Sequence, residues 1–113
     1  MNILQELITL LSGLGVPVET GIFSDIAPDE YLVVTPLADT FPLHADNHPL
    51  NETQEARLSL YSKGNYISRK NQIVRALIDA GFTITDRLYV GYEDDTHYHA
   101  YAIDVAKNYE MGE

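Results

Sequence analysis

The hydrophobic pattern changes its period between Glu52 and Val105, and this change constrains the fold of the chain more than any other feature. From Glu52 onward apolar and polar side chains alternate, which places Ala56, Leu58 and Leu60 on one face of a predicted strand. A helical pattern with a period of about 3.6 residues follows, and two alternating segments come after it. A strand, a helix and a hairpin in this order predict an α+β domain.

The predicted strand covers residues 53–62, and the helix after it covers about residues 66–80. Asn65 can accept a backbone N–H as the N-cap of this helix, and Gly81 suits a left-handed cap after its last turn. The predicted buried stripe of the helix consists of Ile67, Asn71, Val74, Leu77 and Ile78.

Two strands over residues 82–92 and 96–106 form the predicted hairpin at the end of the chain. Its turn contains the acids at 93–95, and the polar tail after Ala106 is expected to fray. The alternating side chains are predicted to be Phe82, Ile84, Leu88, Val90 and Tyr92 in the first strand and His97, His99, Tyr101, Ile103 and Val105 in the second.

The first half of the chain supplies the remaining elements. Apolar side chains at three- and four-residue steps predict a helix over about residues 2–13. Pro17 is tolerated only at the edge of a sheet, so residues 16–21 are predicted to form a short edge strand. Residues 30–37 are rich in β-branched and aromatic side chains and form the next predicted strand. Residues 38–52, with two prolines and two asparagines, predict a long loop or an extended arm.

These elements predict a single domain over residues 1–113, with the order α-β-β-β-α-β-β. We expect an antiparallel-dominated sheet of about four to five strands with both helices on one face. No apolar run approaches the roughly 18 to 20 residues that cross a bilayer, and the first helix lacks the positive charge of a secretory signal. We therefore expect no membrane contact and an intracellular protein. The chain has no cysteine, which excludes disulfides, thiolate metal sites and cysteine nucleophiles.

Charge is distributed unevenly along the chain. Residues 1–56 contain nine acids and no lysine or arginine, whereas residues 57–113 contain eight acids and seven of these bases. The net charge of -10 repels a phosphate backbone, which argues against general nucleic-acid binding. An identical neighbour, in contrast, offers both signs of charge.

Arg69, Lys70 and Arg75, with the neighbouring Tyr66, form a candidate interface on the second helix. Three interpretations are open: a solvated helix face, a weak phosphate-binding face, or a face that pairs with the acidic half of an identical neighbour. The third accounts for the charge asymmetry. Because it joins two different patches of one chain, it is a head-to-tail contact, which closes into a ring when the rotation allows.

His44, Asp46 and His48 are the strongest chemical candidates, because two imidazoles and a carboxylate this close can bind zinc or a similar cation. Nothing in the sequence around them orients the rings, and a metal site needs such support. We therefore interpret this loop as an arm that orders on a partner, and we predict no metal site.

A second polar cluster lies at the hairpin turn, where solvated side chains are common. Ser59, Ser62 and Ser68 lack the glycine context of an activated hydroxyl, and the chain has no phosphate-binding or dinucleotide fingerprint. We therefore predict no enzyme activity, no catalytic residue and no cofactor. The members of the hairpin cluster are Glu93, Asp94, Asp95, His97 and His99.

The segments DEYLVVTPL, EARLSLYSKGNYISRKNQIVRALIDAGF and EDDTHYHAYAIDVAKNYE, after an N-terminal helix, resemble the tail-terminator or tail-completion proteins of long-tailed bacteriophages and prophages. The resemblance covers nearly the whole chain. Its most specific part is a strand ending in Leu60-Tyr-Ser-Lys63, a helix closing at Ala80-Gly-Phe82, and a hairpin containing Tyr101-Ala-Ile-Asp-Val105.

The resemblance implies a minor tail protein without catalytic residues that caps the tail tube, commonly as a hexameric ring, and joins it to the head. Its implied partners are further copies of itself, the tail tube protein and the head-tail connector protein, with DNA only passing through the lumen. Its implied location is the tail or neck of the virion, and the host cytoplasm during assembly. Arg69, Lys70 and Arg75 would contact neighbouring subunits or the connector, and residues 40–53 would reach an adjacent protein. Acids facing the lumen would keep DNA from sticking.

Two alternatives remain open. Another phage neck or head-closure protein would share this architecture but bind other partners. A small metal-dependent enzyme would use His44, Asp46 and His48, or His97 and His99.

Overall fold

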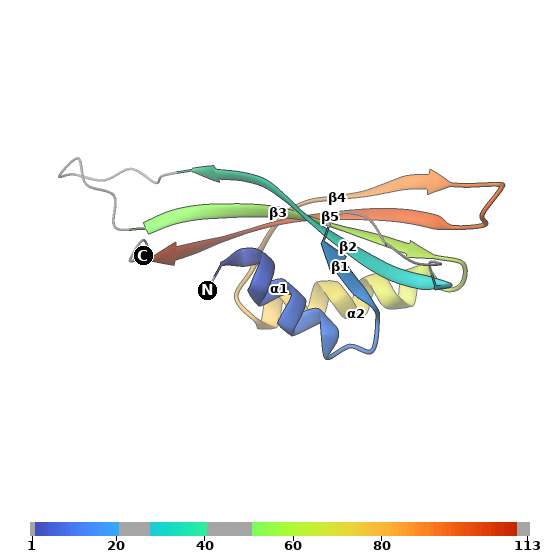
Figure 1. Cartoon of the computed structure of the whole chain (residues 1–113), viewed down its shortest axis with the longest axis horizontal. Helices are drawn as coiled ribbons and strands as arrows, with labels where there is room; N and C mark the ends of the chain where they lie inside the picture. The colour runs from blue at the N-terminus through green and yellow to red at the C-terminus, as the bar shows by residue number, and fades with distance from the viewer. Residues whose placement is uncertain (1, 21–27, 41–50, 111–113) are drawn as a thin grey trace.

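The computed structural model describes residues 2–20, 28–40 and 51–110, which form a five-stranded sheet with two helices on one face (Figure 1). The predicted α+β class, the order of the elements and the position of the helices are confirmed. The elements are α1 (Ile3–Ser12), β1 (Val18–Thr20), β2 (Glu30–Thr40), β3 (Asn51–Ser62), α2 (Tyr66–Asp79), β4 (Thr83–Tyr92) and β5 (His99–Glu110).

The strands lie in the order β1-β2-β3-β5-β4, so β3 is the central strand. It pairs antiparallel with β2 on one side and with β5 on the other, and β4 completes the terminal hairpin. Only β1 is parallel to its neighbour, with Val18 opposite Leu32. The prediction of a short edge strand after Pro17 is therefore confirmed. The described part of the chain is elongated, with extents of 53 × 24 × 23 Å.

Both helices begin with an asparagine cap. The side chain of Asn2 accepts a hydrogen bond from the Gln5 amide, and that of Asn65, as predicted, accepts one from the Ser68 amide at 3.2 Å. Gly81 takes the predicted left-handed conformation after α2, with φ of 90°. No helix within the described ranges is long and apolar enough to cross a membrane.

The core lies between the helices and one face of the sheet. The predicted inward face of β3 is confirmed, since Ala56, Leu58 and Leu60 are fully buried. Each fully buried leucine contributes roughly 2 kcal/mol of apolar burial. The helices contribute the facing side chains Ile3, Leu7, Leu11, Ile73 and Leu77.

The predicted buried stripe of α2 is largely wrong. Leu77 is buried and Val74 is half-buried, but Ile67, Asn71 and Ile78 are exposed, the two isoleucines at 51% and 59%. The structure buries Ile73 instead, because the side of α2 that carries Ile73 and Leu77 faces the core.

The predicted loop over residues 38–52 is too long, and the predicted fraying after Ala106 is wrong. β2 continues to Thr40 and β3 begins at Asn51, which pairs with Glu110 at the end of β5. A register shift after Pro36 lets β2 pass the proline. Pairing along the central strand satisfies the backbone of these polar segments, which outweighs their loop-like composition.

The end of β5 is also tied to both helices. The Glu6 carboxylate of α1 accepts hydrogen bonds from Lys107 Nζ at 2.5 Å and from the Tyr109 hydroxyl at 2.7 Å, and Lys107 also donates to the carbonyl of Ala80. Burial by itself raises the pKa of Glu6, but the bonds from Lys107 and Tyr109 outweigh it, so the pKa lies below its usual value of 4.5. Burial and the bond to Glu6 raise the pKa of Tyr109.

Replacing Glu6 with Gln should lower the free energy of unfolding at pH 7 by about 1 kcal/mol, because charge-assisted bonds to Lys107 and Tyr109 are lost. Since the folded-state pKa of Glu6 is lowered, its contribution is present above pH 4.5 and disappears as the pH falls below this value. Urea unfolding at pH 7 and at lower pH measures both effects. Glu110→Gln, at an exposed site on β5, the strand of Lys107 and Tyr109, is the control. Equal stability of the two variants at pH 7 would contradict the prediction.

Candidate interface surfaces

Arg69, a predicted interface residue, forms hydrogen bonds within its own chain. Its guanidinium donates to Glu30 Oε1 at 2.8 Å, to the carbonyl of Leu14 at 3.0 Å and to Gln72 Oε1 at 2.7 Å. These bonds join α2 to the end of α1 and to the start of β2. The contact of Arg69 with a neighbouring subunit stays a prediction. The contacts that the structure shows for Arg69 stabilise its own chain.

Tyr66 and Lys70 lie on the other side of α2, against the terminal hairpin. The Tyr66 ring stacks on His99 at 5.0 Å and lies 5.4 Å from Tyr89. Lys70 Nζ lies 5.2 Å from the centre of the Tyr101 ring, in a cation–π contact. The aromatic rings therefore form a layer between α2 and the strands β4 and β5, with Lys70 at its margin.

Three described cations form no ion pair with another described residue: Lys70, Arg75 and Arg87. Arg75 is exposed on α2, and Arg87 is exposed on β4. Lys70 and Arg87 belong to the same edge of the molecule, where α2 lies against the terminal hairpin, whereas Arg75 is on the exposed side of α2. The paired cations are Arg57 with Asp104, Lys63 with Asp29, Arg69 with Glu30 and Lys107 with Glu6.

Strand β4 was not predicted as an interface, although it is an edge strand with exposed apolar side chains. Leu88 is 59% exposed and Val90 is 63% exposed, and Tyr89 and Tyr92 are also exposed. The predicted single alternation from Phe82 to Tyr92 is wrong, because register shifts occur between Ile84 and Asp86 and again before Gly91. A strand edge of this kind attracts other chains unless something covers it. The sequence signal for the irregularity is the interruption of the apolar alternation by a polar residue and a glycine.

The face of the sheet opposite the helices carries a cluster of tyrosines. The rings of Tyr31 and Tyr61 stack at 4.9 Å, and Tyr98 meets Tyr31 edge-on at 5.5 Å. Lys63 Nζ lies 4.9 Å from the centre of the Tyr98 ring. Burial, and then the neighbouring Tyr98, Tyr61 and Glu93, raise the pKa of Tyr31, which therefore stays a neutral phenol.

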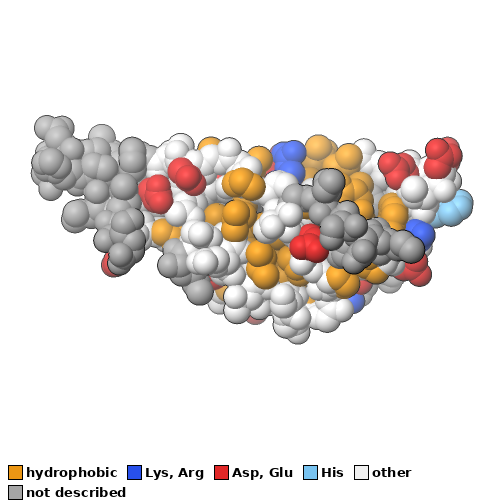
Figure 2. Space-filling model, in the orientation of Figure 1, with side chains coloured by type: hydrophobic (Ala, Val, Ile, Leu, Met, Phe, Trp, Pro, Cys, Tyr) orange, Lys and Arg blue, Asp and Glu red, His pale blue; other side chains and the backbone are white. Residues whose placement is uncertain are grey.

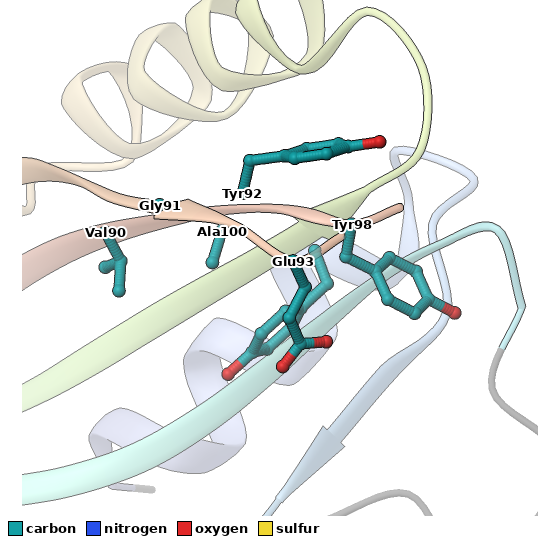
Figure 3. Close-up of a pocket in the computed structure, with 7 residues that line it drawn as sticks. Val90, Gly91, Tyr92, Glu93, Tyr98 and Ala100 are labelled. Atoms are coloured by element: carbon teal, nitrogen blue, oxygen red, sulfur yellow. The ribbon is translucent and has the colours of Figure 1, made fainter. Parts of the chain in front are cut away.

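A pocket of about 330 Å³ lies beside this cluster, near the turn of the hairpin (Figure 3). Figure 3 shows Val90 and Ala100 on the side of the hairpin opposite to Tyr92. Glu93, the one charged side chain among the described lining residues, accepts a hydrogen bond from Thr96. The lining of the pocket combines tyrosine rings, small apolar side chains and one carboxylate. The lining residues are Tyr61, Val90, Gly91, Tyr92, Glu93, Tyr98 and Ala100.

The histidines of the hairpin each contact a tyrosine. His97 Nδ1 lies 2.9 Å from the Tyr92 hydroxyl, and His99 Nδ1 lies 3.0 Å from the Tyr89 hydroxyl. His97 belongs to the turn and not to the strand, because β5 begins at His99. No group of three or more potential metal ligands occurs in the part of the chain that the structure describes. The first candidate set, His44, Asp46 and His48, lies outside the described residues.

Comparisons with known proteins do not assign the chain to a family. No protein-family model matches the sequence, and no curated protein matches it. The evidence on function is therefore the set of surfaces described above and the resemblance found in the sequence.

Replacing Arg69 with Ala should lower the free energy of unfolding by about 1–2 kcal/mol, because it leaves Glu30 and the Leu14 carbonyl without their donor. Arg75→Ala, on the exposed side of the same helix, is the matched control and should cost less than about 0.5 kcal/mol. Chemical denaturation of both variants measures the difference. Similar losses for the two variants would show that the Arg69 contacts contribute little.

Proposed function

We propose that this protein is a tail terminator of a long-tailed bacteriophage or prophage. In this function it acts as a structural subunit that forms a ring, hexameric by its resemblance to that family. The ring caps the tail tube and joins it to the head connector. The observation that carries the proposal is strand β4, an edge strand with large exposed apolar side chains. Such an edge promotes aggregation of an isolated monomer, and in a subunit that assembles it can be buried against a neighbour.

The shape of the molecule supports the same function. A subunit in a ring needs two different lateral surfaces for its neighbours, and further surfaces for the proteins above and below the ring. The described chain offers several distinct surfaces: the edge formed by α2 and β4, the opposite edge at β1 and β2, and the tyrosine cluster on the helix-free face.

The negative charge of the chain supports a ring through whose lumen DNA passes without binding. Acidic side chains are scattered over the face seen in Figure 2, with several near its right-hand end, and hydrophobic side chains gather over its middle. Glu93, Asp94 and Asp95 at the hairpin turn are exposed and form no described ion pair. Like charge of this kind keeps a phosphate backbone at a distance.

Adding the purified protein to polymerising tail tube protein of the same phage or prophage should stop tube growth and leave a ring on one end of each tube. Electron microscopy measures tube length and end structure. The variant Leu88→Asp should lose this activity, because a carboxylate replaces an exposed apolar contact on β4. Ser12→Asp, at an exposed position on α1, is the control.

Unchanged tube lengths together with tube ends that carry no protein would contradict the proposal. Binding to the head connector but not to tubes would instead favour a neck or head-closure protein.

A further inference from the structure

One flank of α2 and the adjacent face of β4 form a continuous surface, which we name the α2–β4 surface. Arg69 points to Glu30 on one side of the helix, and Lys70 points to Tyr101 on the other. Because residues 3–4 positions apart share a helix face, the exposed flank beyond Lys70 lies toward the edge of the sheet at β4. The surface consists of Ile67, Lys70, Val74 and Ile78 from α2 with Arg87 and Tyr89 from β4.

The α2–β4 surface combines apolar area with positive charge. Ile67, Ile78 and Tyr89 are exposed, and Lys70 and Arg87 form no ion pair with a described residue. Arg87 lies opposite Ile103, whose side chain is buried under the helices, so Arg87 projects from the same face of the sheet as α2. None of the six residues of the surface is acidic. In a chain of net charge -10, such a surface selects a partner with acidic groups beside its apolar contacts.

The second surface lies where β2 ends and β3 begins, and we name it the β2–β3 end. Asp39, Glu52 and Glu55 lie there, and none of them forms an ion pair with a described cation. Asp39 pairs in register with Gln54. The side-chain oxygen of Gln54 accepts a hydrogen bond from the backbone N–H of Ile3 at the start of α1. This end is opposite to the β4–β5 hairpin turn along the length of the molecule (Figure 1).

The two surfaces cannot meet within one chain. β3 and β5 lie between β2 and β4, so the strands are three spacings apart, about 14 Å. Two complementary patches on different parts of one chain describe a heterologous contact between copies. A symmetric contact between two α2–β4 surfaces would instead place Lys70 and Arg87 of one copy near the same cations of the other, which is repulsive.

We propose that the α2–β4 surface of one copy binds the β2–β3 end of the next copy, head to tail. Lys70 and Arg87 face Asp39 and Glu52 across this contact, and Ile67, Ile78 and Tyr89 supply its apolar part. This inference rests on the proposed ring-forming function and adds the two surfaces that join neighbouring subunits.

Cross-linking tests the direction of the contact, since the chain has no natural cysteine. The single variants Arg87→Cys and Asp39→Cys are mixed and treated with a short bismaleimide, free in solution and on tail tubes. Head-to-tail contact predicts cross-linked pairs in the mixture and almost none in either variant alone. The double variant should give a ladder of oligomers. Ser12→Cys, combined with Arg87→Cys, is the control.

Two results would overturn the inference. Cross-linked pairs of Arg87→Cys alone would show a symmetric contact. A mixture that cross-links no more than the Ser12→Cys control, both in solution and on tubes, would show that the two surfaces do not meet.

Charge exchange tests the role of the four charged side chains. The double variant Lys70→Glu/Arg87→Glu and the double variant Asp39→Lys/Glu52→Lys should each weaken association by about tenfold or more. Combining all four changes in one chain should restore association, because the charges are then exchanged and remain complementary. Asp94→Lys/Asp95→Lys makes the same change in charge at the hairpin turn and should not weaken association. Arg69 is left unchanged because it has a structural role.

Failure to restore association in the fourfold variant would overturn the proposed pairing of charges. The tube-capping assay separates this failure from failure of the proposed function. If the protein caps tubes but the fourfold variant does not regain association, the protein has the proposed function and its subunits join through other surfaces. If association is regained and the expected cross-links form, but the protein never caps tubes, the head-to-tail contact is present and the protein has another function.

Discussion

Packing of both helices against one face of β3 is the constraint on which the rest of the structure depends. Ala56, Leu58 and Leu60 form the floor of the only core that the described residues build, and α1 and α2 cover it from the same side. Two helices cannot cover the whole sheet in a molecule that is 53 Å long. The edge strand β4, the end of β2 and β3, and the opposite face of the sheet therefore remain available for other contacts.

The ion pairs follow from the same arrangement. Arg69 joins α2 to Glu30 at the start of β2, and Lys107 joins β5 to Glu6 of α1, so each helix is tied to the sheet by a charge-assisted contact. These ion pairs leave fewer cations free to contact other chains. Among the charged residues without a described ion pair, Lys70 and Arg87 lie where α2 meets β4, and Asp39, Glu52 and Glu55 lie at the far end of β2 and β3. The proposed charge complementarity between copies follows from how charge is used within each copy.

Much of the fold could be predicted from local patterns. The order of helices and strands, the caps at Asn65 and Gly81, and the inward face of β3 follow from interactions between residues close in sequence. The candidate site was predicted less well. Arg69 was grouped with Lys70 because they are adjacent in sequence, yet adjacent residues on a helix point about 100° apart, and they contact different elements.

The sequence by itself determined the α+β class, the single hydrophobic layer and the excess of acid in the first half, because composition and periodicity do not depend on how the elements are placed. Tertiary structure alone decided which face of α2 is buried, since both Ile73 and Ile78 fit a helical stripe and only the position of the sheet distinguishes them. It also decided that β4 is an exposed edge and that the polar tail at Tyr109 is ordered, because strand order and backbone pairing join residues far apart in the chain.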